Sequence, residues 1–363
     1  MKYIKKFIIG LLTIVSLAVG VLLVAVGYSD RVSPVDYPLI GCVGMAIPIA
    51  IALNLASLLL MLSVCWRRAW IPLLAFALAY VPIRTYIPLH FDSEPPADCL
   101  KLVSYNVCTY GGNFKYEHGL DTVTAYIMAQ KPDIVCIQED MSTKFEPVEK
   151  WQQLMPYNDT VHVNFGRKEI IAVGIHTRFP ILKKELIDYT AEANGSVAFY
   201  LLIGKDTVIV INNHLEGTHL TKEQRERYSD MVTSGPSDRR LVEEQALDLI
   251  GKLTESMVKR APEAEAVHQY IEAHANYPTI VCGDFNDTPI SYARHIIAQG
   301  LTDCYAETGC GLGLSYNKKG FNFRIDHIFC TSHFTPYKCV VDSKMDASDH
   351  YPLLCWLKMT DKP

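Results

Sequence analysis

The 363-residue sequence has no internal repeat, no low-complexity run and no Cys-x-x-Cys pair. The first two absences exclude repeat and collagen-like architectures, and a hydrophobic fraction of 49% excludes a disordered chain. Without a Cys-x-x-Cys pair, the sequence lacks the usual spacing of a cysteine zinc site, although eleven cysteines are present. At this length the chain is expected to hold more than one structural unit.

Charge is scarce in the first ninety residues, which carry seven bases and two acids. The remaining residues hold 27 bases and 37 acids, so the net charge of −5 conceals a formal +5 in the first part and −10 in the second. An acidic domain is a poor electrostatic match for long polyanions, because nucleic-acid affinity depends largely on Lys and Arg. The charge pattern argues against a protein that coats DNA, and it divides the chain near residue 90.

Within the first part, charge is absent from long apolar runs. Phe7–Tyr28 and Tyr37–Trp66 are each long enough to cross the roughly 30 Å hydrocarbon core of a bilayer as a helix. A third run begins at Ala69 and continues to about residue 89, interrupted by Arg84. We therefore expect a multi-pass anchor over residues 1–90, with three transmembrane helices at about 7–28, 37–66 and 69–89. A cleaved signal peptide is the alternative for the first run, but its length and the second run oppose it.

The placement of Lys and Arg predicts the orientation of this anchor, because both residues are enriched in cytoplasmic loops. The basic N-terminus and the Arg67-Arg68 turn are expected inside the cell, which places everything after residue 90 outside the cytoplasm, on the periplasmic side. If the third run does not span, the domain faces the cytoplasm instead. Arg84 would also fit a transport or sensing role, but no second ionisable residue interrupts the runs to pair with it.

Residues 91–99 contain paired prolines and three acids, which is typical of a linker. Beyond it, short β-rich runs alternate with helical patterns, as in an α/β or α+β domain packed around sheet. The expected strands are 101–105, 134–138, 170–176, 197–203, 207–212, 279–282, 325–330, 337–341 and 353–357. The expected helices are 121–130, 143–154, 237–259 and 291–298.

Polar side chains stand where the apolar strands of this domain begin or end. They are Asn106, Glu139, Asn213, His214, Asp284, Asn286, Asp326, Asp349 and His350. Singly, each has a structural alternative as a turn residue, a helix cap or a hydrogen-bonded histidine. Together they supply the hard oxygen ligands, the water-orienting carboxylate and the phosphate donors that Mg²⁺-assisted phosphoester cleavage needs.

These residues lie in six short motifs: SYN at 104–106, IQE at 137–139, NNHLE at 212–216, GDFND at 283–287, RIDHIF at 324–329 and SDH at 348–350. In this order the motifs resemble those of the endonuclease/exonuclease/phosphatase (DNase I-like) superfamily, here of a membrane-anchored bacterial type. The resemblance spans about residues 100–357. It implies a four-layer α/β/β/α sandwich over residues 100–363, preceded by the three transmembrane helices.

The resemblance also implies a metal site. Glu139 would be the principal ligand of Mg²⁺, with Mn²⁺ as the alternative ion, and Asn106 and Asp349 would assist. One departure is Cys108, which occupies a position that carries a carboxylate in some nuclease branches. A neutral thiol is a poor Mg²⁺ ligand, so the nuclease type of metal shell is not fully reproduced.

The remaining residues would act on water and phosphate, according to the same resemblance. Asp284 would orient or deprotonate the attacking water, and Asn286 would hold that water and a phosphate oxygen. His214 would donate to the phosphate, while Asp326 would orient His350 to stabilise the developing charge. Asn213 and Tyr316 are the expected substrate contacts, Tyr316 from a glycine-rich loop at the mouth of the cleft.

The sequence thus predicts a membrane-anchored, Mg²⁺-dependent phosphoesterase, most specifically a phosphodiesterase. The anchor raises the local concentration of lipid headgroups, and with the acidic domain this favours a lipid or small phosphodiester. An extracytoplasmic nuclease acting on DNA or RNA is the enzymatic alternative. A catalytically inactive receptor for a phosphate ligand is the second alternative. No obligate protein partner is evident.

Overall fold

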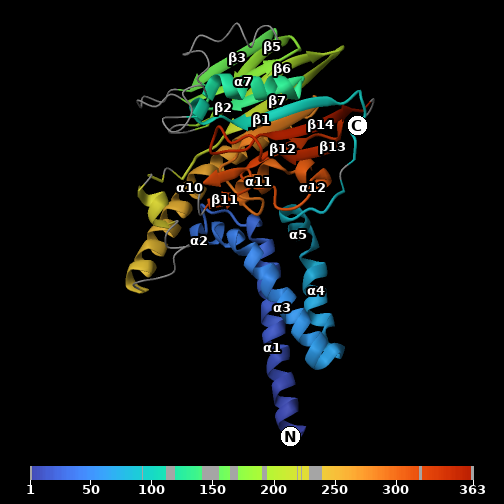
Figure 1. Cartoon of the computed structure of the whole chain (residues 1–363), viewed down its shortest axis with the longest axis vertical. Helices are drawn as coiled ribbons and strands as arrows, with labels where there is room; N and C mark the ends of the chain where they lie inside the picture. Colours follow the sequence, from blue (N-terminus) through green and yellow to red (C-terminus); the bar gives the residue numbers. More distant parts are fainter. Residues whose placement is uncertain are drawn as a thin grey trace.

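The structure is a computed structural model that describes residues 2–91, 93–111, 119–140, 155–163, 171–189, 194–218, 220–221, 223–228, 239–318 and 321–360. The first ninety residues form a helical stalk that extends from one end of a two-sheet domain (Figure 1). The N-terminus lies at the far tip of the stalk, and the C-terminus lies on the domain (Figure 1). The chain passes from the stalk to the domain between residues 86 and 100.

Three passes of the chain build the stalk (Figure 1). Helix α1 (Lys2–Gly27) leads to the domain, α3 (Ile47–Cys65) returns toward the tip, and α4 (Trp70–Leu78) with α5 (Tyr80–Tyr86) leads back. A short helix, α2 (Pro38–Gly41), and 3-10 turns at Ser29–Arg31 and Val43–Ala46 connect α1 to α3, and a third 3-10 turn at Trp66–Arg68 connects α3 to α4.

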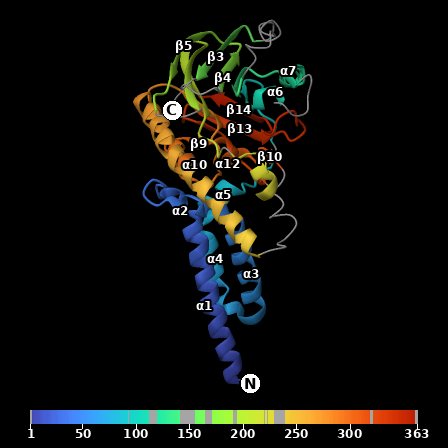
Figure 2. The ribbon, with the colours of Figure 1, turned by 90° about the vertical axis from the view of Figure 1, so that its left-hand side faces the viewer.

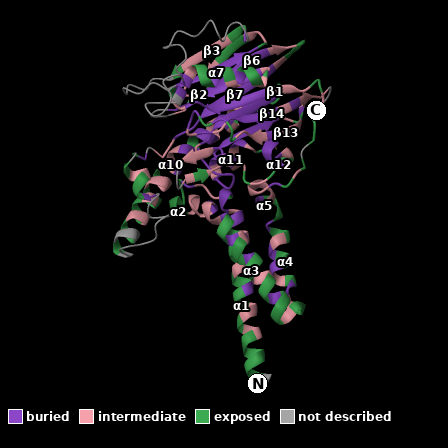
Figure 3. Cartoon of the chain, viewed as in Figure 1, coloured by how far each residue is buried: buried purple, intermediate pink, exposed green. Residues whose placement is uncertain are grey.

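Two stretches of the stalk, Tyr3–Gly27 and Pro38–Arg68, are long and apolar enough to cross a membrane. Only 17% and 22% of their most apolar windows are buried within the protein, and Figure 3 shows both helices largely exposed or half-buried. A core helix of this composition would be covered by other elements. The exposed apolar surface of the stalk is the kind that a bilayer would cover.

The expected third membrane helix at 69–89 is instead divided into two short helices. Pro82 has no N–H to donate to the carbonyl oxygen of Leu78, so helical hydrogen bonding is interrupted near Ala79. The hydroxyl of Tyr28 donates to that carbonyl at 2.9 Å. With nine and seven residues, neither α4 nor α5 is long enough to span a bilayer alone. The structure thus has two long apolar helices rather than the three predicted.

Two six-stranded sheets form the domain, with strand orders β13-β14-β1-β2-β4-β3 and β5-β6-β7-β8-β12-β9. The first contains β1 (Leu100–Asn106), β2 (Ile134–Gln138), β3 (Tyr157–Val163), β4 (Ile171–Thr177), β13 (Phe334–Val341) and β14 (Leu353–Met359). The second contains β5 (Ile181–Leu186), β6 (Gly195–Ile203), β7 (Asp206–His214), β8 (Thr279–Asp284), β9 (Thr302–Asp303) and β12 (Asp326–Cys330). The pairs β1–β2 and β7–β8 are parallel, and the other neighbouring strands are antiparallel.

Side-chain alternation along the strands packs the two sheets face to face. In β7, Val208 and Val210 enter the core between the sheets, whereas Ile209 and Ile211 pack beneath helices on the outer face. Those helices are α10 (Arg239–Ala273) and α11 (Tyr292–Ile297), and α7 (Gly119–Gln130) covers the outer face of the first sheet. The order of layers is therefore helix, sheet, sheet, helix, the predicted two-sheet α/β sandwich.

Each of the nine strands expected from the sequence overlaps a strand of the structure, and β2 matches residue for residue. The predicted helix at 237–259 is the beginning of the 35-residue α10. The predicted helix at 143–154 lies outside the described residues. The remaining short elements are α6 (Cys108–Gly111), α12 (Cys304–Thr308) and a hairpin of β10 (Tyr316–Lys318) and β11 (Phe321–Phe323).

The domain rests directly on the stalk. Arg84, the charge in the third apolar run, pairs with Glu307 of α12 at 2.5 Å. Gly44 lies so close to the domain that a Cβ built on it would stand 2.0 Å from the carbonyl oxygen of Ile290. After the stalk, the expected linker at 91–99 leads to β1. The linker thus joins two units that are also in direct contact.

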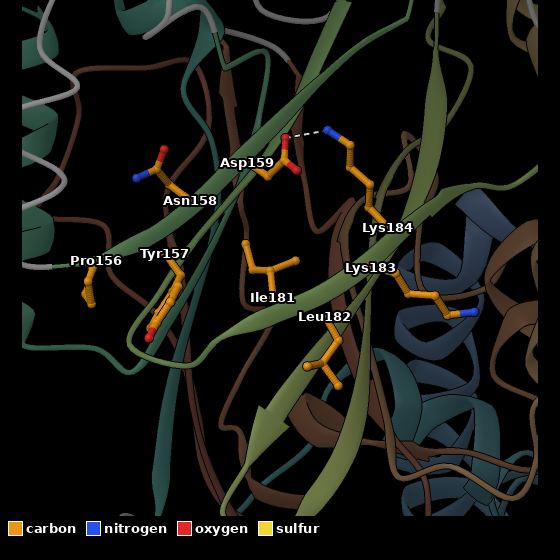
Figure 4. Close-up of a pocket in the computed structure, with 8 residues that line it drawn as sticks. All are labelled: Pro156, Tyr157, Asn158, Asp159, Ile181, Leu182, Lys183 and Lys184. Atoms are coloured by element: carbon orange, nitrogen blue, oxygen red, sulfur yellow. Dashed lines mark hydrogen bonds and ion pairs between the residues drawn. The ribbon is translucent and has the colours of Figure 1, made fainter.

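A groove of about 490 Å³ lies between the edges of the two sheets, lined by Pro156, residues 157–159 of β3 and residues 181–184 of β5 (Figure 4). Lys184 reaches across it to Asp159 at 2.5 Å. None of the residues predicted to act on a phosphoester lines this groove. The predicted site residues lie instead at the ends of the central strands.

Candidate active site

The central strands of both sheets deliver polar side chains to one place. Asn106 ends β1 and Glu139 directly follows β2, while His214 ends β7 and Asp284 ends β8. Because β1–β2 and β7–β8 are parallel pairs, their carboxyl ends meet at common sheet edges. Asp326, the first residue of β12, stands directly opposite Asp284 in the antiparallel register. The strand register itself therefore assembles the site.

The amide of Asn106 joins the contributions of the two sheets. Its Nδ2 donates to Asp284 Oδ2 at 3.0 Å and lies 3.3 Å from Glu139 Oε1. Its Oδ1 accepts from the backbone N–H of Cys108 at 3.0 Å, which fixes the orientation of the amide. One side chain thus holds a carboxylate from each sheet within hydrogen-bond range.

Two site residues adopt left-handed backbone conformations, Glu139 with φ of 57° and Asn286 with φ of 52°. Residues other than glycine seldom do so unless their surroundings hold them. Next to Glu139, the buried carboxylate of Asp140 accepts from the hydroxyls of Tyr110 at 2.7 Å and Thr160 at 2.9 Å. This turn aims Glu139 into the site instead of continuing β2.

Asn286 is held by the strand ends around it. Its backbone N–H donates to Asp284 Oδ1 at 2.8 Å, and its Nδ2 donates to the carbonyl oxygen of Leu215 at 2.9 Å. These bonds fix the loop that follows β8. The predicted pair of water-orienting residues, Asp284 and Asn286, is therefore brought together.

A histidine–carboxylate pair forms the other side of the site. His350 Nδ1 donates to Asp326 Oδ2 at 2.8 Å, and its Nε2 points toward Asp284 Oδ2 at 3.6 Å. Burial alone would lower the pKa of His350, but Asp326 and Asp284 raise it to about 10. His350 is therefore an imidazolium at neutral pH, suited to donate a proton or a hydrogen bond.

His214 and Tyr316 complete this surface. His214 Nε2 lies 3.7 Å from Asp284 Oδ2 and 3.9 Å from Glu139 Oε1. The ring of Tyr316 meets that of His350 edge to face, with 5.0 Å between centroids. The predicted phosphate donor and one predicted substrate contact thus border the same carboxylates.

Burial and neighbouring carboxylates oppose the charged forms of the site acids. Burial raises the pKa of Glu139 and of Asp284, neighbouring carboxylates raise each further, and His214 and His350 lower both. Burial alone would also raise the pKa of Asp349, which His350 and Lys318 lower. A divalent cation would relieve this repulsion, and carboxylate and amide oxygens are the donors that Mg²⁺ and Mn²⁺ prefer. The donor set of Asn106, Glu139 and Asp349 therefore fits such an ion.

A second set of possible ligands, Asp284, Asp326 and His350, has donor atoms within 4.8 Å of one another. In this set His350 Nδ1 is already bonded to Asp326 Oδ2, so that carboxylate oxygen is shared with the imidazole. The structure thus offers two neighbouring groups of donors, one around Glu139 and one around Asp326. Cys108 does not contribute to the group around Glu139, because burial and nearby acids raise the pKa of its thiol, which stays protonated against Asp349.

One predicted substrate contact lies away from the cleft. Asn213 is fully buried, and its Nδ2 donates to the carbonyl oxygen of Cys282 at 2.9 Å. It alternates with Asn212 along β7, so the two side chains point to opposite faces of the sheet. Asn213 therefore stabilises the β7–β8 pair, and its side chain is enclosed by the protein.

Sequence reasoning missed the polar contact that links the sheets beneath the site. Asn212 Oδ1 accepts from Gln138 Nε2 at 2.6 Å, and its Nδ2 donates to the carbonyl oxygens of Gly174 at 2.9 Å and Ile137 at 3.1 Å. The sequence signal for this contact is a polar residue, Gln138 in β2 and Asn212 in β7, at a strand position whose side chain faces the other sheet. This contact ties β7 of one sheet to β2 and β4 of the other.

Two serines, also missed, fix the motifs at the rim. Ser348 Oγ donates to the carbonyl oxygen of Asn106 at 2.8 Å and accepts from the backbone N–H of His350 at 3.2 Å. Ser315 Oγ accepts from the backbone N–H groups of Ile325 and Asp326 at 3.0 and 3.1 Å. Each serine holds one member of the His350–Asp326 pair.

Comparisons with known proteins agree with this geometry. The model of the endonuclease/exonuclease/phosphatase family matches residues 103–350, and a domain of unknown function (DUF8431) matches residues 6–86. A search of curated proteins finds no match.

Solved structures share the fold at low identity. The catalytic domain of human Nocturnin, solved with bound sulfate, is 16% identical with a TM-score of 0.51, and the match covers 74% of this chain and 96% of that domain. An endonuclease/exonuclease/phosphatase family protein and a mannosyl-6-phosphatase, both from Bacteroides thetaiotaomicron, are each 16% identical with a TM-score of 0.49. Their matches cover 74% and 72% of this chain and the whole of theirs. From its motifs, its site geometry and the family match, the chain belongs to the endonuclease/exonuclease/phosphatase family.

Proposed function

We propose that the protein is a membrane-anchored, divalent-metal-dependent phosphodiesterase that hydrolyses a lipid or small phosphodiester. The observation that carries this proposal is the position of Asp284, which lies between the amide of Asn106 on one side and the imidazolium of His350 on the other. A buried carboxylate with a cation site beside it and a proton donor opposite suits the addition of water to phosphorus.

In this proposal Glu139, Asn106 and Asp349 would hold Mg²⁺ or Mn²⁺. Bound there, such an ion would supply positive charge to the phosphate oxygens. The protein's own contribution is to fix these donors, through Asn106 and the left-handed turn at Glu139. Substitution of Glu139 therefore removes the main ligand while leaving the strand register intact.

Asp284 accepts a proton from the attacking water, and Asn286 holds the loop that positions this water. His214 and His350 donate to the phosphate oxygens from the opposite side, with Asp326 keeping His350 in orientation. Tyr316 packs against the His350 ring and borders the space where the substrate lies. Contacts within the protein position these groups without a bound substrate, and such preorganisation favours catalysis.

The substrate class follows from where the site lies. The domain carries a formal charge of −10 beyond residue 90, which disfavours long polyanions. The β10–β11 hairpin, which carries Tyr316, lies at the end of the domain that faces the stalk in both views (Figures 1 and 2). A phosphodiester in or near the membrane surface would be presented to this edge. Helices α4 and α5 together make a third pass along the stalk, so the basic N-terminus and the α3–α4 turn lie at the end opposite the domain (Figure 1). If these basic segments are cytoplasmic, the domain lies on the extracytoplasmic, periplasmic side.

The test uses the full chain in lipid nanodiscs with sphingomyelin, phosphoinositides, a chromogenic phosphodiester and duplex DNA as substrates. Turnover that requires Mg²⁺ or Mn²⁺ and is lost in Glu139→Gln is the expected result, with His333→Ala, a substitution outside the site, as the matched control. Hydrolysis of DNA alone would favour a nuclease instead, and phosphate-ligand binding without turnover would favour a receptor. Protease protection in sealed vesicles reports the side on which the domain lies.

A further inference from the structure

Helix α10 extends beyond the domain that it covers. Its C-terminal half packs on the second sheet through Ala264, Val267 and Ile271. Its N-terminal half leaves the sheet and descends past α2 to the height of the upper part of α3, in both views (Figures 1 and 2). This half therefore lies beside the membrane helices rather than above them.

One face of this half is in contact with the loop that joins the membrane helices. Cys42 Sγ lies 3.4 Å from Thr254 Oγ1 and 3.7 Å from Met257 Sδ. Gly41 also faces Met257, because a Cβ built on it would lie 3.2 Å from the sulfur atom. Thr254 and Met257 thus mark the face of α10 that is turned toward the stalk.

The same face continues toward the N-terminus of α10 as an apolar stripe. Leu247, Ile250, Thr254 and Met257 are spaced by three, four and three residues, so they lie on one side of the helix. Met257 is buried, whereas Ile250 and Leu247 are 39% and 70% exposed. The stripe therefore passes from protein contact into open surface at the level of the stalk.

We infer that the Leu247–Ile250 surface of α10 lies in the outer boundary of the lipid bilayer and seats the catalytic domain on the membrane. This inference rests on the anchoring of the stalk in a membrane, which is part of the proposed function. Its support is the continuity of the stripe with the stalk contact and the position of the helix beside α3. An exposed apolar stripe on a helix at this level is covered by lipid when its polar residues face water.

The chemistry of the surface defines the lipid that it fits. Glu243 and Glu244 accompany Arg240 at the end of the helix, so this half carries no net positive charge that would select anionic headgroups. Insertion then depends on apolar contact, and a zwitterionic phosphatidylcholine bilayer is sufficient. Seating α10 in the boundary would hold the domain close to headgroup phosphodiesters.

The experiment places tryptophan at the stripe and measures quenching by brominated phosphatidylcholine in proteoliposomes of the full chain. We expect Leu247→Trp and Ile250→Trp to add fluorescence that the brominated acyl chains quench. Glu272→Trp, at an exposed position near the other end of the same helix, is the matched control and should add unquenched fluorescence. The native Trp66 and Trp70, which are 70% and 60% exposed on the stalk, report anchoring itself.

The outcomes separate the two proposals. Quenching of the native stalk tryptophans without quenching at 247 and 250 would overturn the role of α10 and leave the anchor intact. Absence of quenching at the stalk tryptophans and at positions 247 and 250 would overturn the membrane anchoring of the stalk.

Activity gives an independent readout. The double variant Leu247→Glu/Ile250→Glu should lower turnover of a bilayer phosphodiester at least several-fold and leave that of a soluble chromogenic phosphodiester unchanged. Gln245→Glu adds one negative charge on the opposite face and should change neither. Equal loss on both substrates would show a folding defect and contradict the inference.

Discussion

The buried guanidinium of Arg324 donates a hydrogen bond to the backbone carbonyl oxygen of Thr85, in the last turn of α5. Arg324 also donates to the carbonyl oxygen of Leu312 at 2.8 Å and lies over the ring of Tyr305 at 4.3 Å. It precedes the catalytic-site residue Asp326 by two positions. The end of the stalk and the loop that leads into the active site are therefore joined by one side chain.

Arg324→Ala should loosen the domain from the stalk. The substitution leaves several carbonyl oxygens without a donor in a buried place, at a cost of about 3 kcal/mol. Thermal unfolding of the full chain in nanodiscs should therefore begin at a lower temperature, and limited proteolysis should cut faster near residues 86–99. Arg178→Ala, which removes an exposed ion pair with Asp133, should leave both measurements unchanged. Equal behaviour of the two variants would contradict this role of Arg324.

Gly44→Ala tests the second contact between the stalk and the domain. The added Cβ would stand 2.0 Å from the carbonyl oxygen of Ile290, so the two units must move apart, at a cost of roughly 1–3 kcal/mol. Gly10→Ala is the matched control, because nothing lies within 4 Å of the added atom. We expect differential scanning calorimetry to show a lower transition temperature for Gly44→Ala only. A normal transition in that variant would mean that the contact does not hold the units together.

His350→Gln should lower kcat by about 10²–10⁴-fold, the range for loss of a general acid or charge-stabilising group. Asp326→Asn should lower kcat through the orientation of His350, since it removes the charge that holds the Nδ1–H. Because the two residues act as a pair, the double variant should be little worse than His350→Gln alone. Steady-state kinetics of the three variants checks this, and additive losses would show that the residues act independently.

Glu263 makes stability depend on pH. Burial, with an added contribution from Glu216, raises the pKa of this carboxyl from 4.5 to about 7, although the backbone N–H of Glu216, Asn194 and Arg260 lower it in part. The folded state therefore binds more protons than the unfolded state between these values, so the contribution of Glu263 to stability falls as pH rises from about 4.5 to 7.

Glu263→Gln should remove the pH-dependent contribution of Glu263 to stability, which is on the order of 3 kcal/mol for the full pKa shift. Measured by chemical denaturation, the stability of the variant relative to the unmodified chain should rise between pH 5 and pH 8. Glu265→Gln, two residues away on the same helix and only partly buried, is the control and should show no such change. A pH-independent difference between Glu263→Gln and the unmodified chain would show that Glu263 titrates normally.

Much of the domain could be predicted from sequence because its central strands are short apolar runs bounded by polar motifs. The edge strands β3 and β5 were not predicted. Their sequences, YNDTVHV and ILKKEL, carry polar residues that solvent exposure at a sheet edge permits. Apolar periodicity therefore identifies strands covered on both faces better than strands at the rim.

The site residues were predicted as a set, but their partners were not. Arg84 has no ionisable partner within the apolar runs, and its partner Glu307 lies 223 positions away in the chain. Asn213 and Asn212 are adjacent and identical, so the sequence does not tell that Asn212 bonds to the facing sheet and Asn213 to the neighbouring strand β8. Contacts of this kind depend on tertiary packing, which a local pattern does not record.

The hydrogen bonds of Asn212 with Gln138, Ile137 and Gly174 have a consequence for how this enzyme family member could diversify. They prevent one sheet from sliding over the other, so the separation between Glu139 and Asp284 is a property of the scaffold. Loops at the rim can then lengthen, shorten or change sequence without retuning that separation. Variation in the loops and the spacing of the two carboxylates are therefore separable, because a pair of buried amides fixes the spacing.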